Sequence, residues 1–283
     1  MNYLLLLILT LLGGTCFGVE EKPIWVSLTT IPSRLSRVNL TLASLKNQSL
    51  QPDLIILCLP EICLKENATY ELPFEILNDP AITIIRCAND WGPATKLLGC
   101  LAECHDPETR IIVVDDDIIY PYDLVEKLVA RSDSYPHAAI GFCGWNVADL
   151  LKGRDYFYSH LIYEDRIPNL PFVSKADVLE GYRGVLTKRK FWDDAVYAYS
   201  DAPKRAFYVD DVWFSGHLAR KKIARLAFKY EPQKTLSTWD TYRTIWKATN
   251  SADDTNALSK RPDFLLSNQE TALYFGPKCW KIK

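Results

Sequence analysis

Short apolar runs and helical patterns alternate along the first half of the chain. Four runs rich in Ile, Val and Leu predict buried strands, at residues 24–28, 54–59, 82–85 and 110–114. Apolar residues at helical spacing predict helices that begin near Val38, Pro93 and Pro121. Because such strands joined by helices form sheets that are covered on both faces, we predict an α/β fold with a mostly parallel central sheet flanked by helices.

The second half of the chain is less regular. A helix is predicted over 210–222 and a strand over 224–230, whereas the aromatic-rich segment 145–175 is expected to form loops with short elements. The pattern assigns no structure to the connection between the second and third strands. Since no break in composition separates two parts, residues 19–283 are predicted to form a single domain, in which 235–283 is a C-terminal tail of uncertain structure.

The first residues are typical of a targeting segment. Tyr3 to Leu12 is almost entirely Leu and Ile, and the small residues after it end at Gly18, which favours a cleaved signal peptide over 1–18. No basic side chain precedes the run, and the alternative is a short signal anchor. Either alternative places the rest of the chain in the secretory pathway lumen (endoplasmic reticulum or Golgi) or outside the cell. A membrane is expected as a partner only if the segment is uncleaved.

The overall charge excludes one class of partner. The 283 residues carry 33 Lys and Arg against 35 Asp and Glu, a net charge of −2, and no long basic run. Nucleic acid is therefore not expected as a partner. Hydrophobic residues make up 48% of the chain, which is enough for one globular core.

Cysteines and glycosylation motifs are consistent with a secretory route. Seven cysteines follow the predicted signal peptide, so at least one thiol stays free or pairs with another chain. We predict a few disulfides and several buried thiols. Cys100, Cys104 and His105 are poor zinc candidates because no second pair lies at zinc-binding spacing. Three Asn-X-Ser/Thr motifs predict a glycoprotein if they are exposed, at Asn39, Asn47 and Asn67.

Three consecutive carboxylates follow the fourth predicted strand. Asp115, Asp116 and Asp117 lie where ligands bind in an open α/β sheet, beyond the carboxyl end of a strand. Such close carboxylates repel one another unless a cation neutralises them, and Mg²⁺ or Mn²⁺ prefers oxygen ligands. In an extended segment Asp115 and Asp117 point to the same side, so we predict them as the metal pair, with Asp115 also near a ribose. The alternative is an acidic turn that favours the N-terminus of the next helix.

Five segments in this order resemble motifs of GT-A glycosyltransferases, especially the inverting family 2-like group that uses nucleotide diphosphate sugars. They are residues 26–34, 90–96, 114–117, 181–185 and 209–213. The resemblance covers roughly Ile24 to Tyr230. It implies a GT-A (nucleotide-diphospho-sugar transferase) fold, a nucleotide-sugar donor, a carbohydrate or glycoconjugate acceptor, and Mn²⁺ or Mg²⁺. Asp210 stands where many relatives have Glu, and no QxxRW-type motif follows, so processive polysaccharide synthases are poor comparisons and the acceptor stays open.

The resemblance implies contacts with the donor on two loops. Thr29, Thr30 and Arg34 are expected to contact the nucleotide after the first strand. Gly181 and Gly184 are expected in a donor–acceptor loop. The alternatives are a surface or capping role for Arg34 and simple turn positions for the two glycines.

The second nucleotide-binding segment also makes sense from its residues alone. Gly92 allows close backbone approach, and the helix that begins at Pro93 turns its positive end toward a phosphate. Lys96 is then placed to neutralise a diphosphate, the alternative being a solvated helix lysine.

An acid pair begins the helix predicted over 210–222. Asp210 and Asp211 allow one carboxylate to cap the helix and the other to accept a proton, and we predict Asp211 as the general base of an inverting transfer. His217 is a weak candidate for a further ligand, and a packed or surface histidine is the favoured alternative. A set of aromatic residues could form a sugar platform, although core packing explains most aromatics: Trp145, Tyr156, Phe157, Tyr158 and Tyr163.

Two other functions compete with glycosyl transfer. A non-catalytic, metal-dependent carbohydrate-binding protein on the same fold would keep the aspartates of the triplet but have no use for Asp211. A Mg²⁺-dependent phosphoryl-transfer enzyme is disfavoured because no P-loop is present. The pattern does not identify the sugar or the acceptor.

Overall fold

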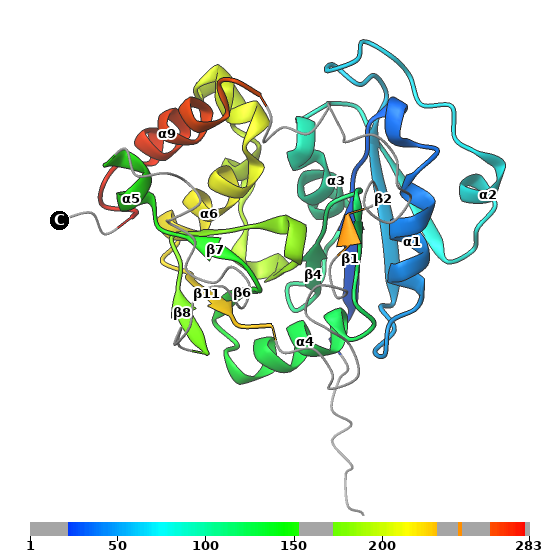
Figure 1. Cartoon of the computed structure of the whole chain (residues 1–283), viewed down its shortest axis with the longest axis horizontal. Helices are drawn as coiled ribbons and strands as arrows, with labels where there is room; N and C mark the ends of the chain where they lie inside the picture. The colour runs from blue at the N-terminus through cyan, green and yellow to red at the C-terminus, as the bar shows by residue number, and fades with distance from the viewer. Residues whose placement is uncertain (1–21, 153–171, 231–242, 245–260, 281–283) are drawn as a thin grey trace, which may run out of the picture.

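A central sheet of eight strands lies between two layers of helices in the computed structural model, which describes residues 22–152, 172–230, 243–244 and 261–280 (Figure 1). The strand order is β3-β2-β1-β4-β10-β6-β11-β8. The strands of this sheet are β1 Ile24–Leu28, β2 Leu54–Pro60, β3 Ile82–Cys87, β4 Arg110–Val113, β6 Ala138–Gly141, β8 Val173–Lys175, β10 Val185–Lys188 and β11 Ala224–Phe228. Two small pairs lie beside it, β5 (Ile118–Ile119) with β12 (Arg243–Thr244), and β7 (Gly144–Trp145) with β9 (Val178–Leu179).

Parallel pairing dominates the sheet. Strands β1 to β4 pair in parallel, as do β6 and β11, whereas β10 runs antiparallel to both β4 and β6, and β8 runs antiparallel to β11. The predicted α/β class with a mostly parallel, helix-flanked sheet is therefore confirmed. Successive side chains of a strand point to opposite faces of the sheet, and a helical layer covers each face. Strands β1, β2 and β4 are therefore largely apolar on both sides.

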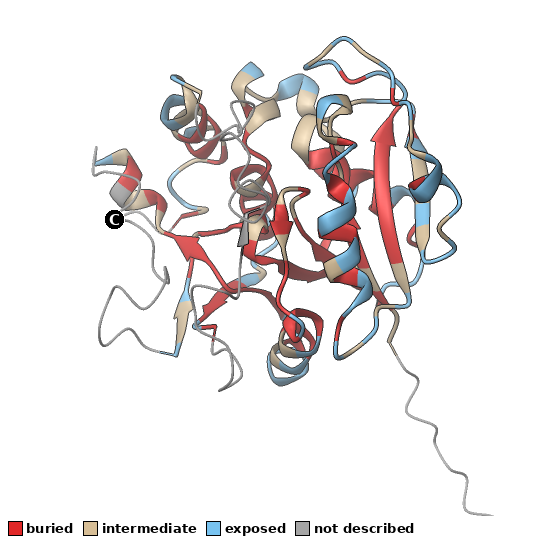
Figure 2. Cartoon of the chain, turned by 45° about the vertical axis from the view of Figure 1, so that its right-hand side comes forward, coloured by how far each residue is buried: buried red, intermediate tan, exposed pale blue. Residues whose placement is uncertain are grey.

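The two helical layers enclose separate halves of the core. On one face, α1 (Val38–Lys46) and α4 (Leu124–Ser134) pack against the sheet, and on the other face α3 (Thr95–Glu103) and α6 (Asp210–Arg220) do so. Leu42 of α1 thus shares one cluster with Val26, while Leu97 of α3 shares the other with Ile56. Figure 2 shows the buried residues concentrated in the strands and on the inner sides of these helices.

Three further α-helices lie within the described part of the chain. The short α2 (Phe74–Leu77) lies in the connection before β3, and α5 (Val147–Leu151) follows β7. The longer α9 (Phe264–Phe275) packs on the outside of α6, with Phe275 against Gly216, where a Cβ would lie 2.3 Å from its ring. This helix falls within 235–283, the tail to which the sequence pattern assigned no structure.

The topology brings several segments to one edge of the sheet. The parallel strands β1 and β4 end there, so the residues after Leu28 and after Val113 lie close together. Because β10 is antiparallel to β4 and Val185 pairs with Val113, the turn before β10 reaches the same edge. Helix α6 leads into β11, which is parallel to β6, and so α6 begins at this edge as well.

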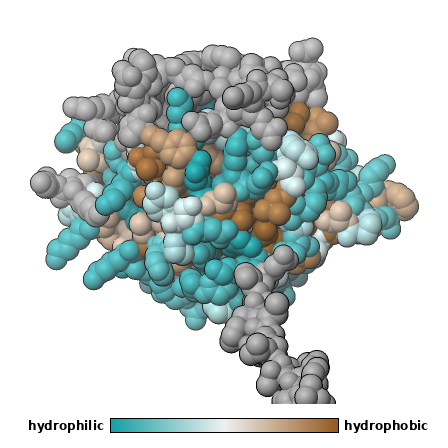
Figure 3. All heavy atoms as spheres, turned by 90° about the horizontal axis from the view of Figure 1, so that it is seen from below, coloured by the Kyte–Doolittle hydropathy of each residue, from teal (hydrophilic) through white to brown (hydrophobic). Residues whose placement is uncertain are grey.

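The structure also shows the surroundings of the cysteines and of the glycosylation motifs. The seven cysteines within the described ranges form no disulfide, and only Cys279 is partly exposed. Asn39, Asn47 and Asn67 are all exposed, as the glycosylation prediction requires. Residues 1–18 lie outside the description, and no helix within it is long and apolar enough to cross a membrane. Figure 3 shows a mainly hydrophilic surface with small apolar patches on the face seen from below.

Candidate active site

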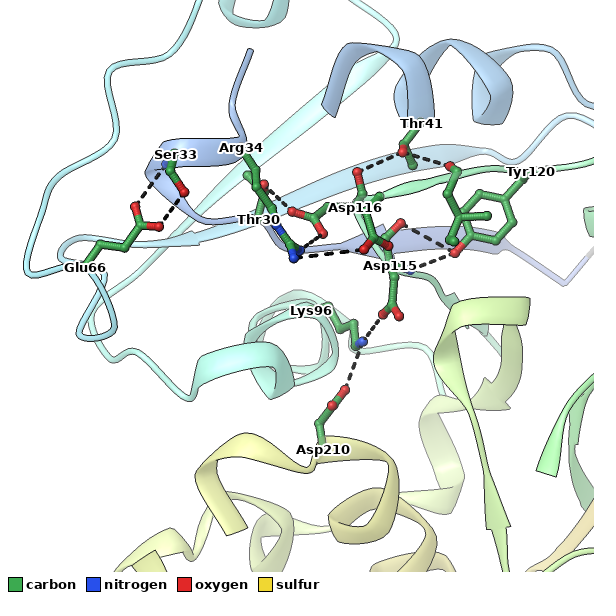
Figure 4. Close-up of polar contacts among 12 residues, drawn as sticks. Thr30, Ser33, Arg34, Thr41, Glu66, Lys96, Asp115, Asp116, Tyr120 and Asp210 are labelled. Atoms are coloured by element: carbon green, nitrogen blue, oxygen red, sulfur yellow. Dashed lines mark hydrogen bonds and ion pairs between the residues drawn. The ribbon is translucent and has the colours of Figure 1, made fainter. Parts of the chain in front are cut away.

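A buried lysine joins three elements at this edge. The Lys96 side chain is only 5% exposed, and its ammonium lies 2.5 Å from Oδ1 of Asp115 and 2.9 Å from Oδ2 of Asp210 (Figure 4). Burial by itself would lower the pKa of Lys96, but Asp115 and Asp210 outweigh burial and hold that pKa well above its usual value. The lysine therefore stays charged and ties α3 to the end of β4 and to the start of α6. It is not the solvated helix lysine of the alternative interpretation.

The second acid of α6 faces the turn before β10. Oδ1 of Asp211 accepts a hydrogen bond from the backbone N–H of Gly181 at 2.9 Å. A Cβ on Gly181 would lie 3.3 Å from Nζ of Lys96, 3.4 Å from Oδ1 of Asp211 and 3.6 Å from Oδ1 of Asp115. Glycine thus lets the turn approach all three charged groups closely. The structure brings together four predicted site segments here: the Lys96 helix, the triplet, the Gly181 turn and the α6 acids.

The cluster holds more negative than positive charge. Three carboxylates, on Asp115, Asp210 and Asp211, share one ammonium group. Burial raises the pKa of Asp210, and burial together with the neighbouring Asp210 raises the pKa of Asp211 well above its usual value. A carboxylate whose pKa is raised is a stronger base once it is ionised, which suits it to accept a substrate proton.

The middle residue of the triplet has a structural role. The Asp116 carboxylate accepts hydrogen bonds from the Thr30 hydroxyl at 2.5 Å and from the Arg34 guanidinium at 2.7 Å. The Thr41 hydroxyl of α1 donates to the Asp116 carbonyl at 2.9 Å. Thr30 and Arg34, which were predicted as nucleotide contacts, therefore fasten the loop after β1 to the triplet. Thr29, the third predicted contact on this loop, is partly buried beside them.

The segment Asp115 to Asp117 is not extended, although the prediction that Asp115 and Asp117 point to the same side depended on an extended backbone. A turn at Asp116 and Asp117 separates β4 from β5, because β5 leaves the central sheet to pair with β12. The argument that alternation along a strand puts Asp115 and Asp117 on one side is therefore wrong. Asp115 pairs with Lys96, whereas Oδ2 of Asp117 lies 4.0 Å from Arg34.

The described residues offer oxygen ligands for a divalent cation but do not form a complete metal site. Over the ranges that the structure describes, no group of three or more His, Cys, Asp or Glu side chains is arranged to hold a metal ion. Asp115 and Asp117 nevertheless supply carboxylate oxygens at this edge, the type of ligand that Mg²⁺ and Mn²⁺ prefer. Asp115 and the partly exposed Asp117 remain the residues that would hold such an ion.

Two of the predicted donor-binding glycines have structural reasons to be glycine. Gly92 has a φ of +60°, and a Cβ here would lie 2.7 Å from the Phe207 carbonyl oxygen. Gly184 has a φ of +83°, and a Cβ here would lie 3.2 Å from Leu124 and from Leu128 of α4. Positive φ and close packing account for both residues, and Gly184 faces the α4 layer of the core.

The histidine and aromatic candidates are mostly core residues. His217 is 4% exposed, and its ring lies 4.6 Å from that of Trp213 and 5.1 Å from that of Phe275, as expected for a packed histidine. Burial lowers the pKa of His217 to about 4. Trp145 is 1% exposed and belongs to the core. The other members of the aromatic set, at 156–158 and 163, lie outside the described residues.

Sequence reasoning missed two residues that contact the site segments. The Tyr120 hydroxyl accepts a hydrogen bond from the backbone N–H of Asp115 at 2.8 Å. Glu180 directly precedes Gly181 and is buried beside it. Tyr120 follows the triplet closely enough to have been considered, whereas a single Glu in an irregular segment carries no periodic signal.

Comparisons with known proteins leave this geometry as the basis of the functional argument. No family model and no curated protein matches the chain. The charges, contacts and backbone conformation of the chain itself are what indicate its function.

Proposed function

We propose that the chain is a metal-dependent glycosyltransferase with a GT-A fold, which moves a sugar from a nucleotide diphosphate donor to a hydroxyl acceptor. The observation that carries the proposal is the meeting of Lys96, Asp115, Asp211 and the Gly181 amide at the carboxyl edge of a mostly parallel sheet. Open α/β sheets bind their ligands at this edge. Four of the five segments that resemble the GT-A motifs supply these residues.

Each group has a role in a single displacement. Asp211 takes the proton of the acceptor hydroxyl as that oxygen bonds to the anomeric carbon, while the bond from this carbon to the diphosphate oxygen breaks. The Gly181 N–H holds one carboxylate oxygen of Asp211 in place. Lys96 provides a buried positive charge for the departing diphosphate. A divalent ion on Asp115 and Asp117 would add further stabilisation of the charge on that leaving group.

The proposal is tested by the hydrolysis and transfer of radiolabelled nucleotide sugars. The wild-type chain with Mn²⁺ is expected to release labelled sugar from at least one nucleotide diphosphate donor. Asp117→Asn is expected to weaken Mn²⁺-assisted donor binding about tenfold or more by calorimetry, because it removes a charged oxygen ligand. Asp201→Asn, at an exposed aspartate, is the matched control. A wild type inactive toward every donor would instead favour the carbohydrate-binding alternative.

We also propose that the chain resides in the secretory pathway. Its three sequon asparagines, Asn39, Asn47 and Asn67, are exposed and would accept a glycan without disturbing the core. Expressed in a eukaryotic cell, the full chain is expected to gain mobility on a gel after glycosidase treatment. Replacing all three asparagines with Gln should abolish this shift. A wild type that is cytosolic, unglycosylated and intact at its N-terminus would contradict the proposal.

A further inference from the structure

A thiol and a carboxyl group form a buried pair next to the candidate site. The Cys143 Sγ lies 2.8 Å from Oε2 of Glu180, and the two residues are 0% and 4% exposed. The backbone N–H of Glu180 also donates to the Cys143 carbonyl at 3.2 Å. Side chain and backbone therefore fasten the segment after β6 to the segment after β9.

The thiol acts as the donor in this pair. Burial and the nearby Glu180 raise the pKa of Cys143 well above its usual value, so the thiol keeps its proton. A buried carboxyl group is costly unless its oxygens have hydrogen-bond partners. Replacing a buried polar pair with apolar side chains of similar volume is often neutral or stabilising in proteins, so a role beyond packing is worth testing for this pair.

The pair acts on the site through the next residue in the chain. Gly181 follows Glu180, begins the turn before β10, and donates its N–H to Oδ1 of Asp211 at 2.9 Å. The hydrogen bond from the Gly181 amide links this turn to the Asp211 carboxylate, and the position of the amide depends on where Glu180 is held. A shift of Glu180 would displace the amide and release one oxygen of Asp211.

We propose that Glu180, anchored by the Cys143 thiol, is a positioning residue that fixes the Gly181 amide against the Asp211 carboxylate. The inference rests on the proposed function, in which Asp211 accepts the proton of the acceptor hydroxyl. Glu180 and Cys143 do not touch the substrate in this scheme. Their effect is to hold the base in one orientation, and small errors of orientation lower rates strongly.

Two substitutions at Cys143 separate positioning from packing. Cys143→Ala removes the donor, and Cys143→Ser keeps one, because a hydroxyl also donates to a carboxylate. In the full chain, Cys143→Ala is expected to lower kcat for sugar transfer about tenfold with the donor KM nearly unchanged. Cys143→Ser should restore most of the loss. Cys63→Ala, at a cysteine buried in the connection after β2, controls for loss of a buried thiol.

A second measurement needs no turnover. Labelling with [¹⁵N]glycine limits the backbone amide signals to the glycines, and Asp211→Asn, which replaces the charged acceptor with a neutral one, identifies the Gly181 signal by its shift. The Gly181 amide proton is expected to move upfield in Cys143→Ala, because its hydrogen bond weakens, and to stay near the wild-type position in Cys143→Ser and Cys63→Ala.

The outcomes distinguish this inference from the proposed function. An active wild type whose Cys143→Ala variant matches Cys63→Ala in both kcat and the Gly181 signal overturns the positioning role alone. A loss of kcat that tracks a lower melting temperature and is not restored by Ser overturns it too, since that is the behaviour of packing. A wild type that is inactive toward all donors contradicts the proposed function. If the Gly181 signal then also stays in place in Cys143→Ala, the link between Cys143 and the Gly181 amide is contradicted as well.

Discussion

Replacing Asp211 with Asn is expected to lower the rate of sugar transfer by about 10²–10⁴-fold, the usual worth of a positioned general base. The amide keeps the size of the carboxylate and still accepts the Gly181 hydrogen bond, so the turn before β10 should stay in place. Donor binding should be nearly unchanged, because Lys96 and Asp115 retain their ion pair. Steady-state kinetics together with calorimetry of donor binding measure both effects.

The neighbouring acid provides the matched control for this substitution. Asp210→Asn removes a partner of buried Lys96 and is expected to lower the melting temperature more than the intrinsic rate. The stereochemistry of the fresh product is a second check, because a single displacement inverts the anomeric configuration. Proton NMR that shows retention would make the mechanism untenable, and equal rate losses for the two variants would deny Asp211 its particular role.

Removing the imidazole of His217 is expected to make the fold less sensitive to acid. Burial lowers the pKa of His217 from 6.5 to about 4, so between these values the unfolded chain binds a proton that the folded chain does not. Stability is therefore fully present above pH 6.5 and is lost as the pH falls toward 4. Through this group alone the loss amounts to about 3 kcal/mol of unfolding free energy.

A phenylalanine at this position tests the linkage while keeping a ring between Trp213 and Phe275. Relative to the wild type, His217→Phe should gain about 3 kcal/mol of unfolding free energy as the pH falls from about 7 to about 4. Urea unfolding across that range measures the difference. His137→Gln, at an exposed histidine, is the control for loss of an imidazole that is not buried. If both variants follow the wild-type curve, His217 does not titrate as its burial implies.

The first half of the fold was readable because its strands are long, apolar and separated by helices. The predicted runs at 24–28, 54–59 and 82–85 correspond to β1, β2 and β3, with ends shifted by two residues at most. β6 was missed because Ala138–Gly141 has only four residues, three of them Ala or Gly, which carry little periodic signal. β10 was missed because a strand of four residues preceded by irregular turns has no helix before it to mark its start.

The sequence predicted which residues belong to the candidate site but not which of them contact one another. Asp115, Lys96, Gly181 and Asp211 were each singled out, and the structure brings all four together. Asp116 was passed over because a carboxylate that fastens one loop to another looks the same in sequence as one that binds a ligand.

The sequence by itself determined the fold class and the segments that carry charge. Apolar periodicity decides which faces are buried, and this information is local, so an α/β fold follows from windows of a few residues. Only the tertiary structure decided that Lys96 lies between Asp115 and Asp210. Asp115 is 19 positions from Lys96 in the sequence, and Asp210 is much farther away. It also decided that Gly181 reaches Asp211, because the antiparallel direction of β10 returns that turn to the carboxyl edge of the sheet. Pairing between distant strands sets these distances, and no local pattern encodes it.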